Sequence, residues 1–132
     1  MLADSRAFSG FAVPDLEQAR RFYGDTLGLA VEEGVGSLVL HLAGDRDVLV
    51  YVKPDHTPAT YTILNFPVGD LEGTVDALAE RGVHFERYDG FEQDERGILR
   101  GAGPPIAWFT DPAGNVLSLI QDYAGRPPRH VL

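Results

Sequence analysis

The chain of 132 residues contains no cysteine. Without thiols it cannot form a disulfide framework, bind zinc through thiolates or use a cysteine nucleophile. It also has no run of about 18 apolar residues, and the N-terminal segment MLADSRAF lacks the apolar core of a signal peptide. These absences favour a soluble, cytoplasmic protein.

Basic residues are scarce, since 11 Lys and Arg stand against 20 Asp and Glu, and the formal net charge is −9 at pH 7. A field of this sign repels phosphate backbones and anionic lipids, so we expect neither nucleic acid nor a membrane as a partner. Hydrophobic residues (44%) and charged residues (23%) occur in ordinary globular proportions. The length predicts a single domain over residues 1–132.

An internal repeat is the most informative pattern in the chain. Residues 10–29 read GFAVPDLEQARRFYGDTLGL and residues 65–83 read NFPVGDLEGTVDALAERGV, and five residues of the first copy recur 55 positions later. In both copies a short apolar run precedes Asp-Leu-Glu, and a glycine closes a stretch with apolar residues at helical spacing. Asp15 and Asp70 have the short acceptor side chain that caps a helix N-terminus, and Gly28 and Gly82 stand where a C-cap is expected. Each copy therefore predicts one amphipathic helix.

Strand patterns follow each helix. In the first copy we expect strands at 30–35, 37–42 and 47–53, and in the second copy at 83–88, 106–110 and 115–121. DPAG (111–114) and AGDR (43–46) read as tight turns. The organisation is thus a module at about 6–54, a second at about 61–122 and a tail at 123–132. The segment 89–105 is the one long irregular stretch, and such loops are often functional.

The Asp-Leu-Glu…Phe-Tyr…Leu-Gly string, its repeat and the final FTDPAGNVLSLIQ resemble the vicinal oxygen chelate superfamily, which includes glyoxalases, bleomycin resistance proteins and extradiol dioxygenases. The resemblance covers roughly Phe8 to Gln121. It implies an α+β fold in which two tandem β-α-β-β-β modules form curved mixed sheets around a cleft, with the helices outside. It also implies a homodimer. Superfamily members include both enzymes and non-catalytic drug-sequestering proteins, so the fold does not give the function.

Catalytic relatives hold one divalent metal through His, Gln or Glu side chains on the first and last strands of each module. The corresponding positions here are Phe8, Val50, Ile63 and Ser118. A transition metal needs imidazole, carboxylate or thiolate donors, usually three or more. We therefore expect no metal and no cofactor at this site.

Alternation along the strands assigns side chains to the cleft or to the helix face. If Phe11, Leu64, Phe66, Leu117 and Leu119 face the helices, the cleft receives another set. That set is Phe8, Gly10, Val50, Val52, Ile63, Asn65, Val116, Ser118 and Ile120.

His41 is the histidine with the best case for function, because Leu38, Leu40 and Leu42 alternate with it. In the cleft it could donate to a ligand or act as a base, or it could be a structural histidine. Asn65 is equally open to ligand contact or a structural hydrogen bond. The aromatic residues Tyr51, Tyr88, Phe91, Trp108 and Phe109 could wall an apolar pocket or belong to the core.

The leading hypothesis is a metal-independent protein whose cleft binds a small, largely apolar organic molecule. The expected ligand-binding residues are Phe8, His41, Val50, Ile63, Asn65, Trp108 and Ser118. The alternative is a divergent lyase, isomerase or dioxygenase that uses His41 as a base or a metal site at other residues. A protein-interaction module with a cleft filled by side chains is the third interpretation.

Overall fold

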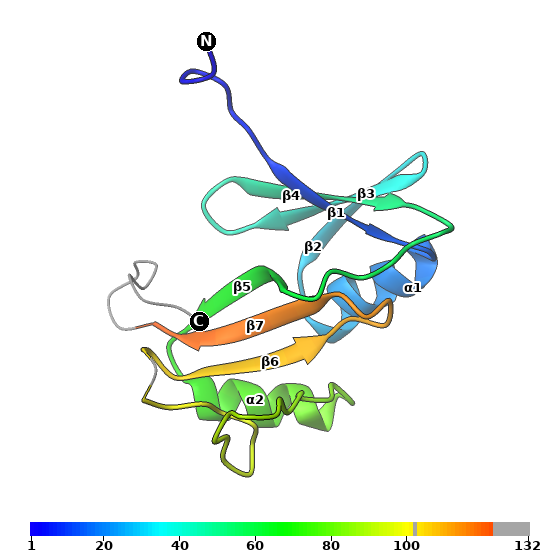
Figure 1. The fold of residues 1–132 in the computed structure, drawn as a ribbon. Coiled ribbons are helices and arrows are strands. Elements are labelled where there is room, and N and C mark those ends of the chain that lie inside the picture. The colour runs from blue at the N-terminus through cyan, green and yellow to red at the C-terminus, as the bar shows by residue number, and fades with distance from the viewer. Residues whose placement is uncertain (102, 123–132) are drawn as a thin grey trace. The chain divides into compact units, whose positions relative to one another are not determined.

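The computed structural model describes residues 1–101 and 103–122, so the tail expected at 123–132 lies outside the described residues. The chain forms two compact units, Met1–Thr57 and Pro58–Leu132. Each contains one sheet and one helical segment, which confirms the predicted α+β class (Figure 1). No helix within the described residues is both long and apolar enough to cross a membrane.

The first unit is a four-stranded sheet with a helix on one face. Its elements are β1 (Ser9–Val13), α1 (Leu16–Arg20), the π-helical turn η1 (Arg21–Thr26), β2 (Ala30–Gly34), β3 (Ser37–Leu42) and β4 (Arg46–Val52). The strand order is β1-β4-β3-β2, with β1 parallel to β4 and the other pairs antiparallel. Asp15 starts the helix as predicted, because its carboxylate accepts a hydrogen bond from the Gln18 N–H at 3.1 Å.

The register of this sheet corrects the predicted face of Val50. Val50 pairs with Phe11 on β1 and with Leu38 on β3, and directly paired residues point to the same side of a sheet. The Phe11 ring lies 5.6 Å from the ring of Tyr23 in η1, so this side is the helix face. Val50 is fully buried there, and the expectation that it faces the cleft is wrong. The match of Val50 with Ser118 is one residue off, because Gly10 pairs with Leu49 where Asn65 pairs with Ser118 in the second unit.

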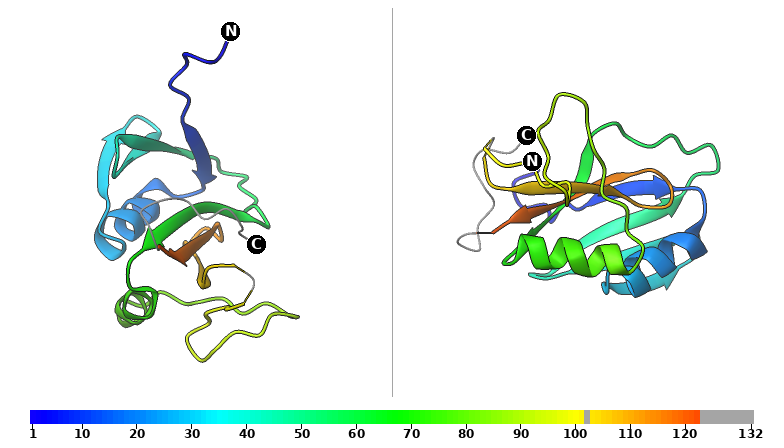
Figure 2. Two further views of the ribbon diagram at one scale, coloured as in Figure 1. Left: turned by 90° about the vertical axis from the view of Figure 1, so that its left-hand side faces the viewer. Right: turned by 90° about the horizontal axis from the view of Figure 1, so that it is seen from below.

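The second unit is a three-stranded sheet with the order β5-β7-β6. Its elements are β5 (Thr62–Val68), α2 (Leu71–Glu80), β6 (Ile106–Thr110) and β7 (Val116–Gln121). Asp70 caps α2 through the Gly73 N–H at 3.0 Å, and the helix contacts β7 (Figure 2). The buried side chains of α2 are Leu71, Val75 and Leu78.

The strand predicted at 83–88 does not form. In place of a strand ladder, the main chain of this segment makes an isolated bridge to β6 between Phe85 and Phe109 and a hydrogen bond of 2.8 Å from the Glu86 N–H to the Trp108 carbonyl. Beyond Glu86 its main-chain groups bond instead to the side chain of Gln93. A local side-chain partner thus replaces the continuing ladder that the apolar alternation predicted.

Candidate functional site

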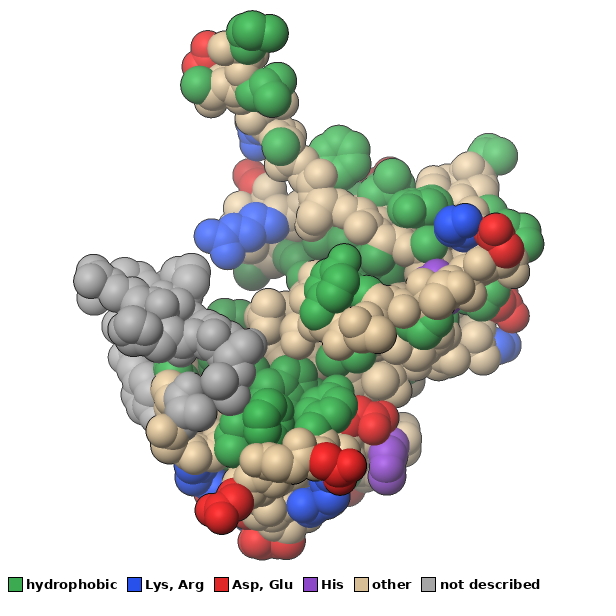
Figure 3. All heavy atoms as spheres, viewed as in Figure 1, with side chains coloured by type: hydrophobic (Ala, Val, Ile, Leu, Met, Phe, Trp, Pro, Cys, Tyr) green, Lys and Arg blue, Asp and Glu red, His purple; other side chains and the backbone are tan. Residues whose placement is uncertain are grey.

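A pocket of about 290 Å³ opens on the second unit, on the face of the sheet that carries Trp108 and Val116. Figure 3 shows hydrophobic side chains gathered over this unit. The aromatic lining residues are Tyr61, Tyr88, Phe91 and Trp108, and the others are Thr60, Thr62 and Val116. The mainly aromatic wall with a few hydroxyl groups has the character of a small-molecule site.

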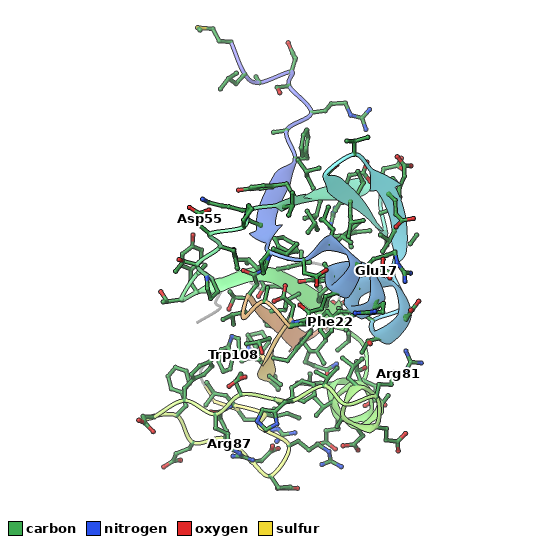
Figure 4. All side chains as sticks on the ribbon, turned by 90° about the vertical axis from the view of Figure 1, so that its right-hand side faces the viewer. Glu17, Phe22, Asp55, Arg81, Arg87 and Trp108 are labelled. Atoms are coloured by element: carbon green, nitrogen blue, oxygen red, sulfur yellow. The ribbon has the colours of Figure 1, made fainter. Side chains whose placement is uncertain are left out.

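Trp108 forms the centre of the aromatic wall. Trp108 lies in β6 (Figure 4), and its side chain is almost fully buried. The Phe91 ring stacks on it with centroids 5.6 Å apart and an interplanar angle of 27°, and the Tyr88 ring meets it edge-on at 5.5 Å and 73°. Tyr88 and Phe91 are themselves partly exposed, so their rings offer apolar surface to a ligand.

The floor beneath this wall is closely packed. Trp108 packs in one cluster with Leu99, Ile106 and Ile120, and Val116 adds to that cluster from β7. Close-packed side chains of this kind hold a ring in one rotamer. The pocket therefore has a fixed base on the sheet and an outer wall on the segment 85–99.

Three of the residues expected at the site come together on this face. Asn65, Ser118 and Trp108 form one row across the sheet, because Ser118 pairs with Asn65 on one side and with Trp108 on the other. The buried Ser118 hydroxyl donates to Oδ1 of the exposed Asn65 at 2.5 Å. With its oxygen engaged, Asn65 presents amide N–H donors.

The other expected residues do not join this row. Ile63 falls within a β5 irregularity, where Thr62 and Leu64 pair with the consecutive residues Val116 and Leu117. Ile63 is therefore an extra residue that the pairing assigns to neither face. Phe8 is 68% exposed and precedes β1 in the first unit.

His41 lies on the face of β3 opposite Leu38 and Leu40, as alternation predicted. Its Nδ1 is 2.8 Å from Asp47 Oδ1, and its Nε2 is 3.3 Å from Glu32 Oε1. The hydrogen bond with Asp47, followed by that with Glu32, raises the pKa of His41 above its ordinary value. The two carboxylates thus favour the protonated form of the ring over the neutral form that a general base needs.

The residues at the family's metal-ligand positions do not fit a metal. Phe8, Val50 and Ile63 have no donor atom in their side chains, and the Ser118 hydroxyl is bonded to Asn65. Within residues 1–101 and 103–122, no group of three or more His, Asp or Glu side chains is placed to hold a metal ion.

Sequence reasoning missed part of the pocket. Tyr88, Phe91 and Trp108 were among the aromatic residues expected to wall a pocket, but Phe109 points away from it and contacts Phe85 at a centroid distance of 5.6 Å. Tyr61 also lines the pocket, although the strand and helix patterns do not single it out. The sequence feature that could have identified Tyr61 is its position in the polar connection PATYT between the modules. A large aromatic side chain in such a connection indicates a binding surface.

Comparison with known proteins gives consistent results. The profile of the Glyoxalase/Bleomycin resistance protein/Dioxygenase superfamily matches residues 7–119. A search of curated proteins gave no significant match.

Several solved structures are similar over most of the chain. A glyoxalase family protein from Bacillus anthracis is 18% identical, with a TM-score of 0.67 and coverage of 93% of this chain and 100% of that one. The antibiotic binding protein TnmS3 from Streptomyces sp. CB03234 is 27% identical, with a TM-score of 0.63 and coverage of 91% and 98%. A glyoxalase/bleomycin resistance protein from the same organism is 28% identical, with a TM-score of 0.58 and coverage of 87% and 100%.

Proposed function

The chain belongs to the glyoxalase/bleomycin resistance protein/dioxygenase superfamily, and from this premise we propose that it binds a small, largely apolar organic molecule without a metal. The observation that carries the proposal is the pocket of Tyr61, Tyr88, Phe91 and Trp108 on the second unit. The similarity to the antibiotic binding protein TnmS3 supports the same class of function.

The pocket favours a flat, apolar ring system. When an apolar ligand covers partly exposed aromatic rings, the removal of that surface from water favours binding by about 25 cal/mol for each Å² of apolar surface buried. The cavity of about 290 Å³ is near the lower end of the range typical of small-molecule sites. It therefore suits a compact ring system, or one ring system of a larger molecule.

Asn65 does not line the pocket itself, but it lies on the same face of the sheet and could give a polar contact to a ligand that extends beyond the aromatic wall. Its amide is exposed on the same face as Trp108, and Ser118 holds the amide oxygen. A carbonyl or ether oxygen on the ligand would accept from the amide N–H, whereas a ligand with only donors would leave it unpaired. The proposal thus predicts an apolar ligand with at least one hydrogen-bond acceptor.

The test is a fluorescence titration with N-phenyl-1-naphthylamine, a neutral aromatic probe, together with native mass spectrometry of untagged protein. We expect saturable binding of the probe and an organic adduct on the purified protein. Replacing Phe91→Ala removes one stacked ring and should weaken the probe about ten-fold. The control Glu92→Gln changes an exposed neighbour on the same segment and should bind as the wild type does. Absence of binding, or equal affinity in Phe91→Ala, would overturn the proposal.

A lyase or isomerase that uses His41 is the second candidate. Asp47 at 2.8 Å from Nδ1 holds the imidazole in one orientation, as a catalytic histidine requires. Loss of turnover in His41→Ala with unchanged ligand binding would establish this candidate. The raised pKa of His41 makes an acid role better matched to it than the base role.

We also propose that the protein is a homodimer, as the resemblance to tandem-module relatives implies. Sedimentation equilibrium tests this directly. A monomer at all concentrations would remove the dimer from the proposal and leave the pocket unaffected, since its lining residues belong to one unit of one chain.

A further inference from the structure

The outer wall of the pocket is carried by a segment that is neither helix nor strand. Tyr88 and Phe91 belong to the stretch between Val83 and Leu99, whose main chain forms isolated bridges rather than a continuous strand. An irregular segment presents its side chains in a fixed place only if its main-chain groups are held by other means. The contacts that hold this main chain therefore determine the positions of the Tyr88 and Phe91 rings.

The side chain of Gln93 holds this segment at three points. Its Oε1 accepts from the Tyr88 N–H at 2.8 Å, and its Nε2 donates to the carbonyls of Glu86 at 3.0 Å and of Gly97 at 2.7 Å. The carboxamide is thereby bonded through both donors and its acceptor, in a half-buried position. The carboxamide thus satisfies main-chain N–H and carbonyl groups that a neighbouring strand would otherwise satisfy.

Glycine at position 97 is required for this arrangement. Gly97 has a φ of +88°, a backbone conformation that other residues adopt only with strain. The hydrogen bond from Gln93 to the Gly97 carbonyl is the shortest of the three that Gln93 makes to this segment. The turn at Gly97 thus aims a carbonyl at the carboxamide.

The bridged segment is tied to β6 on either side. Glu86 N–H donates to the Trp108 carbonyl at 2.8 Å, and Leu99 and Ile106 exchange main-chain hydrogen bonds of 2.8 and 3.1 Å. Gln93 joins these two anchored ends across the excursion that carries Tyr88 and Phe91.

Arg87 also bonds the carbonyls of Gln93 and Asp94, and Arg96 pairs with Asp76 on α2. Gln93 differs from these contacts because it bonds the Tyr88 main chain directly.

We propose that Gln93 is a positioning residue of the pocket: by bridging Glu86, Tyr88 and Gly97 it holds the rings of Tyr88 and Phe91 against Trp108. Through this wall it sets the shape of the ligand that the pocket admits. The part that concerns the ligand rests on the proposed function, whereas the part that concerns the rings does not.

The experiment uses Trp108, the single tryptophan of the chain, as its own reporter. Gln93→Met keeps the side-chain length but removes both donors and the acceptor, and Gln93→Glu keeps the acceptors but places a carboxylate against two carbonyls. Glu92→Gln is the matched control on the adjacent, exposed residue. We measure Trp108 emission and acrylamide quenching without ligand, thermal unfolding, and the affinity for N-phenyl-1-naphthylamine.

We expect both Gln93 variants to unfold cooperatively, to shift Trp108 emission to longer wavelength and to raise the quenching constant about two-fold. Probe affinity should fall about ten-fold, as expected when stacked rings no longer hold one position. Unchanged emission and quenching would overturn the inference. Altered emission with unchanged probe affinity would overturn the part that concerns the ligand. If the wild type itself does not bind the probe, the proposed function fails, while altered emission in the variants still supports the positioning of the rings by Gln93.

A measurement on the wild type keeps the inference testable even if the variants do not fold. The Tyr88 amide should exchange with solvent deuterium much more slowly than the amide of the exposed Glu92, because it donates to Gln93. Equal exchange rates at the two amides would contradict the proposed bridge.

Discussion

The hydroxyl of Ser118 donates a hydrogen bond of 2.5 Å to Oδ1 of Asn65 on the neighbouring parallel strand. Ser118 is fully buried, so its hydroxyl has no water to replace this partner. The bond also leaves the amide N–H groups of Asn65 as the groups offered to a ligand.

Replacing Ser118→Ala should therefore lower the free energy of unfolding by about 1 kcal/mol, the usual net value of one hydrogen bond. Urea denaturation measures this difference. The variant should also bind acceptor-bearing ligands less selectively, because the Asn65 amide can then rotate. Stability equal to that of the wild type would contradict the structural role assigned to this pair.

Val50→Ala should destabilise the first unit without changing probe binding. Val50 is fully buried between Phe11 and Leu38 on the helix face, and removing two methyl groups from such a site costs about 2 kcal/mol. Val52→Ala is the control, because Val52 lies two residues along the same strand and is 41% exposed. Loss of probe affinity in Val50→Ala with unchanged stability would restore the cleft position that the sequence suggested.

The stability contributed by His41 should depend on pH in a defined direction. Hydrogen bonds with Asp47 and then Glu32 raise its pKa in the folded state, so its contribution is complete below the unfolded pKa of about 6.5 and disappears as pH rises through the folded pKa. The difference in unfolding free energy between wild type and His41→Gln should thus be larger at about pH 5.5 than at about pH 8.5. A proton NMR titration should show that Asp47→Asn lowers the pKa of His41, and no change would remove Asp47 as the main cause.

Asp94 should make the pocket wall sensitive to acid. Burial acts to raise its pKa, but hydrogen bonds from the Ile98 N–H, the Arg100 guanidinium and the Arg96 N–H together lower it. The stabilising effect is therefore present above the unfolded pKa of about 3.9 and is lost as pH falls through the folded value. Asp94→Asn should reduce stability at neutral pH by about 2 kcal/mol and flatten the acid limb of the stability profile. Glu95→Gln, an exposed neighbour, should leave that limb unchanged.

Chelation should not affect the protein. Elemental analysis of untagged protein should find no stoichiometric Zn, Ni, Mn or Fe, and EDTA should leave the thermal midpoint and probe affinity unchanged. A stoichiometric metal that is lost on changing Ser118 would mean that the family site is in use and that an enzyme is the better interpretation.

The repeat, the helix caps and most strands could be predicted because they depend on neighbours in the chain. Asp15 and Asp70 cap helices through amides three residues away, and β3 and β6 have the bounds that their alternation predicted. The superfamily follows from these same local patterns, which a profile over residues 7–119 confirms.

The placement of the predicted site residues depended on relationships that no local pattern contains. Alternation orders the side chains within β4, but the hydrogen-bonded register with β1 decides which set faces the helix, and this placed Val50 with Phe11. The pairing of β5 with β7 likewise brought Asn65 beside Ser118 and left Ile63 as an extra residue.

The sequence by itself determined the fold class, the two modules, the absence of thiol chemistry and the poverty of donors at the metal positions, because each follows from residue type and local spacing. Only the tertiary structure decided that Tyr61, Tyr88, Phe91 and Trp108 share one pocket. These residues are up to 47 positions apart in the chain, and strand register together with the Gln93 bridge brings them together. Strand register depends on hydrogen bonds between main-chain groups far apart in the chain, and the bridge depends on one side chain that reaches three main-chain groups. The order of residues constrains both but does not specify them.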